Sequence, residues 1–138
     1  IPAMIWQNRN GGDIYFYPNF IIMWNSRNSF AVVGFDELDI ACKAVQFIEE
    51  EEVPSDTEVV DHTWLKVNKD GSPDRRFSHN YQIPICKYGD VSIKTQTGLN
   101  ESYEFSNYEV IDKFTKCFLE YQIAIINLEY VPSVGIVE

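Results

Sequence analysis

The sequence contains little of what disulfide-stabilised, zinc-binding or membrane-spanning proteins need. Its 138 residues include three cysteines and two histidines. Cys42, Cys86 and Cys117 lie far apart and form no CxxC pair, which argues against a disulfide framework or a zinc site. No apolar run approaches the ~18 residues of a membrane-spanning helix, and no signal peptide is recognisable. We therefore expect a cytoplasmic protein whose three thiols are buried.

Positive charge is also scarce. Eleven Lys and Arg residues face 21 Asp and Glu residues, so the net charge is −10. This balance argues against nucleic acid as a partner and against direct binding to an anionic membrane. The charge is also segregated. Residues 36–61 carry ten acidic side chains and one lysine (net −9), whereas residues 64–87 carry five basic and two acidic ones (net +3). We expect these blocks to neutralise each other or to meet a partner.

Hydrophobic residues are plentiful. They make up 45% of the chain, and 14% of all residues are aromatic, which suits a globular domain with its own core. We expect a single domain over residues 1–138. Because the chain begins at Ile1 and not at a methionine, we expect it to be a fragment of a longer chain or a processed product. The parent chain can itself be attached to a membrane.

Short β-strands are predicted in the first half of the chain. The aromatic and β-branched residues of 14–24 indicate two strands around a Pro18-Asn19 turn. A second turn at 25–28 and a third strand at 29–35 complete an antiparallel meander. Residues 37–50 fit a helical period and a strand period equally well. The glutamate run and Pro54 then end any regular element.

The second half is predicted to contain more strands and then a helix. We expect a strand at 63–68, a long loop at 69–80, and strands at 81–88, 91–95 and 101–106, with a break at Gly89-Asp90 and a turn at 96–100. Ser106 and Glu109 form a capping-box pattern. An apolar stripe with a 3.6-residue period follows, which predicts an amphipathic helix over about 107–127.

This order of elements resembles the pleckstrin-homology-like (PH-like) superfamily, GRAM domains included. The resemblance rests on "GDVSIKTQTGLNESYEFSNYEVIDKFTKCFLEY". The chain is also similar to bacterial domains without an established activity that carry a "DGSPDRRF"-type loop. The resemblance to the PH-like superfamily implies a mainly β fold: a curled antiparallel sheet, or a partly open barrel of about seven strands, capped by the C-terminal helix. It also favours a strand at 38–44. The Pro18-Asn19 turn lacks the cations of phosphoinositide-binding members.

Catalysis and metal binding find little support in the sequence. A nuclease-like site at Pro73-Asp74 would need a downstream strand with the pattern acid-x-Lys. Two residues before Lys94, where the acid should stand, the sequence has Ser92. His79 with Asp74 as its orienting group lacks a Ser-His-Asp or Cys-His arrangement. The candidate ligands for a metal ion lack EF-hand spacing. They are Glu49–Glu52, Asp56, Asp61 and His62. We predict no catalytic residue, no metal and no cofactor.

Anion or partner recognition by the basic loop is the remaining hypothesis. Its candidate residues are Lys69, Arg75, Arg76 and His79. Arginine binds carboxylates and phosphates in a forked geometry. We expect one of the two arginines to pair with Glu49–Glu52 or with Asp61 and so hold the loop, while the other stays available. We also expect Phe77 to anchor the loop in the core.

The leading hypothesis is therefore a non-catalytic PH-like binding or scaffolding module. Its partner would be another protein or another part of the parent chain, and a homo-oligomer is left open. The alternative is anionic-ligand or lipid-headgroup binding, or a hydrolytic enzyme, centred on Asp74, Arg75, Arg76 and His79.

Overall fold

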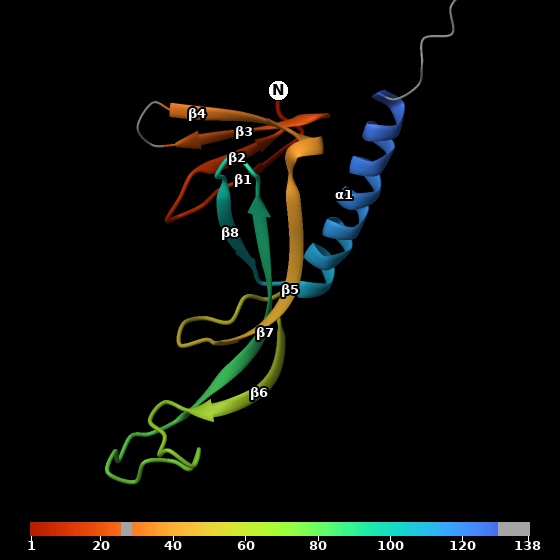
Figure 1. Ribbon diagram of the computed structural model, residues 1–138. Helices are drawn as coiled ribbons and strands as arrows, with labels where there is room; N and C mark the ends of the chain where they lie inside the picture. The colour runs from red at the N-terminus through yellow and green to blue at the C-terminus, as the bar shows by residue number, and fades with distance from the viewer. Residues whose placement is uncertain (26–28, 130–138) are drawn as a thin grey trace, which may run out of the picture. The chain divides into compact units, whose positions relative to one another are not determined.

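The computed structural model describes residues 1–25 and 29–129. The fold is mainly β, with two antiparallel sheets and, among these residues, one C-terminal helix (Figure 1). The mainly β class with one terminal helix, predicted from the sequence, is confirmed. In chain order the elements are β1 (Met4–Trp6), β2 (Asp13–Phe16), β3 (Phe20–Asn25), β4 (Ser29–Gly34), a 3-10 turn (Phe35–Glu37), β5 (Asp39–Ile48), β6 (Glu58–Trp64), β7 (Gln82–Lys94), β8 (Asn100–Phe105) and α1 (Tyr108–Glu129).

The chain forms two compact units, each of which is described by itself. The first comprises Ile1–Ala41, Ser92–Glu101 and Phe114–Glu138, and the second comprises Cys42–Val91 and Ser102–Lys113. Within the described residues, strand pairing closes neither sheet into a barrel. The single domain over 1–138 and the partly open barrel of about seven strands therefore stay predictions.

The first unit contains a four-stranded antiparallel meander in the order β1-β2-β3-β4. The predicted strands on either side of Pro18-Asn19 are β2 and β3, and Tyr17 N–H donates to Phe20 O across the turn at 2.9 Å. The third predicted strand is β4. The three-residue β1 was not predicted, because its sequence is too short to show a period. Residues 26–28 of the predicted second turn lie outside the described residues.

Helix α1 covers one face of this meander. The side chains of that face are buried; they are Trp6, Ile14, Phe16, Ile21, Met23 and Val33. The ring of Phe114 lies 5.4 Å from Trp6, and Phe118 lies 6.3 Å from Phe16, between ring centroids. Gln122 Nε2 donates to Leu38 O at 2.7 Å. The aromatic side chains of the helix and the sheet thus form the core of the first unit.

The start of α1 differs in detail from the prediction. Asn107 Oδ1, and not Ser106, accepts the hydrogen bond of an amide in the first turn, from Val110 N at 3.0 Å. Ser106 Oγ instead donates to Asp56 Oδ1 at 2.8 Å. The expected Ser106 cap is therefore wrong by one residue: Asn107 is an equally good cap. With Asn107 as the cap, Ser106 binds Asp56 in the loop between β5 and β6.

The second unit is built on a sheet with the order β5-β7-β6, in which β8 also pairs with β7. Within the ambiguous segment 37–50, residues 39–48 form β5, in agreement with the strand at 38–44 that the resemblance favoured. The strand predicted at 63–68 lies earlier, at β6. Charged Glu58 and Asp61 interrupt the apolar pattern of its valines, so the sequence does not show where the strand begins. The predicted break at Gly89-Asp90 is wrong, because β7 runs through it without interruption.

Polar contacts hold the acidic block in the second unit. Tyr88 hydroxyl donates to Glu49 Oε2 at 2.6 Å, and burial, followed by this bond, raises the pKa of Tyr88. Lys87 Nζ lies 3.5 Å from Glu58 Oε2 and 2.8 Å from Glu109 Oε1. One member of the basic block therefore meets the acidic block, as the charge segregation suggested.

Candidate binding loop

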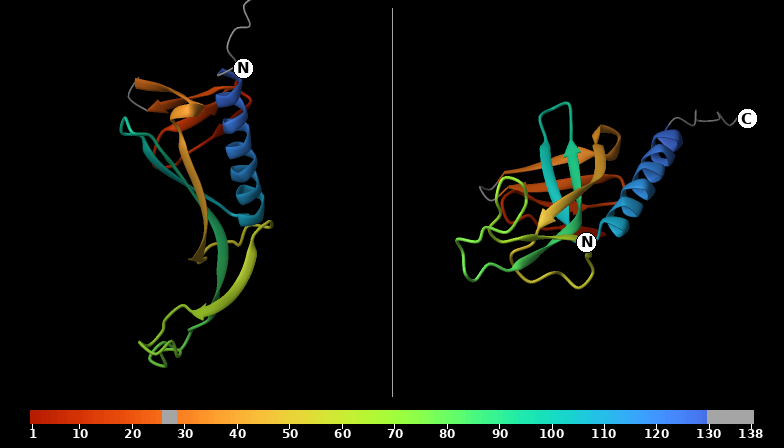
Figure 2. Two further views of the ribbon diagram at one scale, coloured as in Figure 1. Left: turned by 45° about the vertical axis from the view of Figure 1, so that its right-hand side comes forward. Right: turned by 90° about the horizontal axis from the view of Figure 1, so that it is seen from below.

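Residues 65–81 form the loop that joins β6 to β7, at the tip of their hairpin (Figure 2). Its two ends are joined by hydrogen bonds: Leu65 N–H donates to Tyr81 O at 2.9 Å, and Asn80 Nδ2 donates to Lys66 O at 2.7 Å. Lys66 N–H returns a bond to Asn80 Oδ1 at 3.0 Å. These bonds close the base of the loop, so the loop predicted from the sequence is ordered at its ends.

A tight turn forms the first half of the loop. Asn68 N–H donates to Ser72 O at 2.9 Å, and Gly71 has φ +84°, which favours glycine. Asp70 Oδ1 accepts both the hydroxyl of Ser72 at 2.6 Å and its N–H at 3.1 Å. The hydroxyl bond is the main reason that the pKa of Asp70 is lowered. The sequence "NKDGS" therefore specifies this turn through local side-chain bonds.

Asp74 and Arg76 organise the second half. Arg76 Nη2 lies 2.6 Å from Asp74 Oδ2, and Arg76 Nε lies 3.0 Å from Asp74 Oδ1. The backbone N–H of Arg76 also donates to Oδ1, at 3.1 Å. Asp74 is buried and its N–H donates to Lys66 O. The bond from the Arg76 side chain is the first cause of the lowered pKa of Asp74.

Two predictions about the loop are therefore wrong. The arginine that holds the loop is Arg76, but its partner is Asp74 and neither Glu49–Glu52 nor Asp61, because a carboxylate two residues away is already within reach. Phe77 does not anchor the loop in the core: it is 48% exposed, and Lys66 Nζ lies 5.8 Å from its ring centroid. The loop is held by its own hydrogen bonds and not by apolar burial.

The other predicted binding residues remain at the surface. Lys69, Arg75 and His79 are exposed, and within the described residues none of them has a hydrogen-bond or ion-pair partner. Asp74 does not orient His79 in this structure: its carboxylate is bound by Arg76, and among the described residues no hydrogen bond joins it to His79. The loop therefore presents one fixed arginine and three exposed basic or titratable side chains, and it lacks the hydrogen-bonded pair that general-base catalysis would use.

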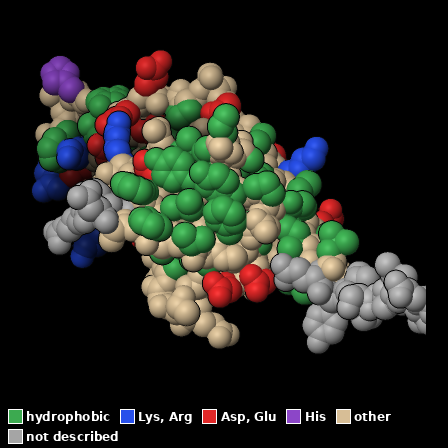
Figure 3. Space-filling model, turned by 90° about the horizontal axis from the view of Figure 1, so that it is seen from above, with side chains coloured by type: hydrophobic (Ala, Val, Ile, Leu, Met, Phe, Trp, Pro, Cys, Tyr) green, Lys and Arg blue, Asp and Glu red, His purple; other side chains and the backbone are tan. Residues whose placement is uncertain are grey.

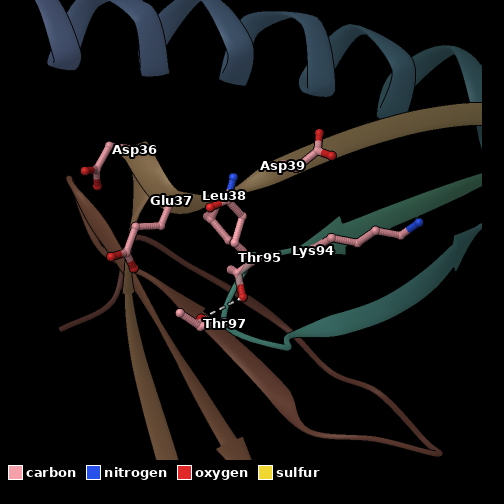
Figure 4. A pocket seen from close by; sticks show the side chains of 8 residues that line it. Asp36, Glu37, Leu38, Asp39, Lys94, Thr95 and Thr97 are labelled. Atoms are coloured by element: carbon pink, nitrogen blue, oxygen red, sulfur yellow. Dashed lines mark hydrogen bonds between the residues drawn. The ribbon is translucent and has the colours of Figure 1, made fainter.

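A groove in the first unit was not predicted. Its volume is about 560 Å³, and it is lined by Asp36, Glu37, Leu38, Asp39, Lys94, Thr95, Gln96 and Thr97. Figure 4 shows the carboxylates of Asp36 and Asp39 pointing in different directions and Lys94 extending away from both. The Thr95 and Thr97 hydroxyls bond each other at 3.0 Å. The charged groups do not converge on one point, as a bound ion would require.

Acidic and thiol side chains were the other candidate ligands. In the described part of the chain, no three His, Cys, Asp or Glu side chains gather in a way that could hold a metal ion. Cys86 is fully buried, and burial raises the pKa of its thiol. Cys117 is exposed and Cys42 is half-buried. The prediction of three buried thiols is thus confirmed for Cys86, met only in part by Cys42 and wrong for Cys117.

The Asp74–Arg76 pair predicts that the loop loosens in acid. The folded-state pKa of Asp74 is lowered from the ordinary value of ~3.9. The ionised Asp74 carboxylate therefore contributes fully to the stability of the loop above about pH 4. This contribution is lost as the pH falls through the lower pKa of the folded state. We expect the Arg76 Nε–H signal in NMR spectra to broaden, and the Arg76 amide to exchange faster, over that range. In Asp74→Asn the signal should no longer follow this titration; an identical titration in Asp74→Asn would contradict the assignment.

Two further findings bear on function. Over residues 1–25 and 29–129, no helix is both long enough and apolar enough to cross a membrane. Comparisons of the chain with models of known protein families, with curated proteins and with solved structures gave no match.

Proposed function

We propose that this chain is a non-catalytic PH-like binding module whose 65–81 loop contacts an acidic segment of a protein partner or of its own parent chain. The element order, strands followed by one C-terminal helix, supports the PH-like assignment. One observation carries the binding role: the Asp74–Arg76 pair fixes the loop while Arg75 next to it stays exposed and unpaired.

Charge supports an acidic target. Lys69, Arg75 and His79 project from one loop of a chain whose net charge is −10, so an acidic segment is repelled elsewhere and attracted here. A preorganised loop loses less conformational entropy on binding than a mobile one. Arg75 can approach a carboxylate with two parallel N–H groups, which lysine cannot do.

The test is the affinity of the chain for a hexaglutamate peptide, measured by fluorescence anisotropy. Arg75→Glu should weaken binding by about fivefold or more, because it removes an attractive charge and adds a repulsive one. Arg9→Glu is the matched control, since Arg9 is also exposed but lies outside the loop; it should change affinity by less than about twofold. Equal affinities for both variants would show that the loop is not the contact surface.

Two other sources of negative charge are separated by added arms of the same experiment. Vesicles containing phosphatidylserine and inorganic phosphate are titrated in place of the peptide. Binding to either one that depends on Arg75, without binding to the peptide, would favour the lipid-headgroup or small-anion alternative. Hydrolysis of p-nitrophenyl phosphate that is lost in His79→Ala would favour the enzyme alternative.

A further inference from the structure

The β1–β4 sheet has an apolar face on the side away from helix α1. We call it the outer face; its eight apolar residues are Ile5, Tyr15, Tyr17, Phe20, Ile22, Trp24, Phe30 and Val32. The strand register aligns Ile5, Tyr15, Ile22 and Val32 in one row across all four strands. Figure 3 shows hydrophobic side chains gathered together on the side of the molecule that it views.

The outer face is exposed and shaped. Phe30 is 61% exposed and Val32 is 57% exposed. The rings of Trp24 and Phe30 are stacked, with centroids 6.0 Å apart, and those of Tyr17 and Phe20 are stacked at 4.8 Å. A depression of about 470 Å³ is lined by Trp24, Phe30 and Tyr17 of these pairs, together with Tyr15 and Ile22. A strand meander with water on one side normally alternates apolar and polar residues, and these strands do not.

We propose that the outer face is the interface of a homodimer, in which it packs against the same face of a second copy. The first argument is area. Four of the eight residues are about half exposed: Ile5, Trp24, Phe30 and Val32. Since an aromatic side chain has ~150–250 Å² of surface to bury, the eight residues together expose roughly 500 Å². A standard interface buries ~800 Å² per partner, and in homodimers ~65% of it is apolar. The outer face therefore supplies the apolar part of one such interface.

The second argument is charge. Two copies of a chain with a net charge of −10 repel each other, so they can approach only through a face with almost no charge. Asp13 is the only charged residue in β1–β4. It pairs with Trp24 and so lies on the outer face, where its Oδ1 already accepts a bond from Asn8 N–H at 3.0 Å. A two-fold interface needs a self-complementary surface, and stacked sheets with apolar inner faces meet this need.

The test measures the mass of the chain of residues 1–138 by analytical ultracentrifugation from low to high micromolar concentration. A dimer has twice the 16.0 kDa of one chain. Its formation should bury Trp24 and shift the tryptophan emission to shorter wavelength. Raising the NaCl concentration should strengthen the dimer, because salt screens the repulsion between copies; binding through the basic loop would weaken instead.

Val32→Glu and Phe30→Glu should each raise the dimer dissociation constant by more than about tenfold, because each buries an unpaired carboxylate. Val110→Glu is the matched control: Val110 is 64% exposed and lies on α1 in the other unit, so its dimer should match wild type within about twofold. Circular dichroism checks the fold of each variant. If one variant does not fold, the other variant and the wild-type emission shift still decide the outcome.

Four results would overturn the proposal. Three concern the dimer: a monomer at every concentration, a dimer unaffected by both outer-face variants, or a dimer that forms without an emission shift. The fourth is an emission shift in a monomer when decaproline is added, which would show that the face is a groove for a peptide. Because the hexaglutamate assay reports on the loop and not on this face, failure of the dimer and failure of the proposed function are separable.

Discussion

Replacing Phe118 by alanine is expected to lower the free energy of unfolding by about 3–5 kcal/mol. Phe118 is 6% exposed, and its ring lies between Phe16 of β2 and Phe35, with centroid distances of 6.3 and 4.9 Å. Truncation to alanine removes these contacts and leaves a cavity between α1 and the sheet. Both elements belong to the first unit at this point, so the loss falls on its core.

Urea unfolding followed by circular dichroism measures this loss. Ile123→Ala is the control on the same helix, because Ile123 is 59% exposed; it should cost less than about 0.5 kcal/mol. The slope of the free energy against urea should stay the same in both variants, since the surface exposed on unfolding changes little. A Phe118→Ala variant as stable as Ile123→Ala would contradict the packing of α1 on the sheet.

The helix itself could be predicted from sequence, because its signals are local. Phe114 and Phe118 recur with the helical period, and polar Asn107 precedes them, so the interval of about 107–127 came close to the observed 108–129. The cap was placed one residue early for a reason that no local pattern contains. Ser106 donates to Asp56, which lies 50 positions earlier in the chain, and Asn107 then caps the helix.

The loop was predicted in part. Its turn is specified by neighbouring residues such as Asp70 and Ser72. The sequence also predicts that one of the two arginines holds the loop while the other stays available, and Arg76 is the one that is paired. Charge alone favours Glu49–Glu52 as the partner of the arginine, because four carboxylates attract a cation more strongly than the single Asp74. In the structure Asp74 is buried beside Arg76, and proximity in the chain decided the pairing.

The strands of the outer face carry a signal in the sequence beyond their strand propensity. The segments "IYFYPNFIIMW" and "SFAVVGF" are apolar at nearly every position instead of at every second one. Such runs are typical of strands that are buried on both faces. In the structure Ile21 and Val33 face the core, while Ile22 and Val32 face away from it. The sequence thus already carried the suggestion that something covers the second face.

Replacing Gly89 by alanine is expected to destabilise the second unit by about 1–3 kcal/mol, the usual cost of overpacking a core. A glycine beside aspartate suggests a strand break in the sequence, but β7 is continuous here. Gly89 is buried, and a Cβ at this position would collide with Ile111 Cγ2 and would lie 3.5 Å from Tyr108 Cα. Glycine is therefore required by the close approach of the first turn of α1, and not by its own backbone conformation.

A double-mutant cycle separates this collision from a general effect of losing glycine. Ile111→Ala removes Cγ2 and leaves space, so it should be destabilising alone but should relieve Gly89→Ala. The double variant should then lose at least about 1 kcal/mol less than the sum of the two single losses, as measured by urea unfolding. Additive losses would mean that Ile111 is not the obstacle. In that case the strand would need glycine for another reason, and the packing of the helix start on β7 would have to be revised.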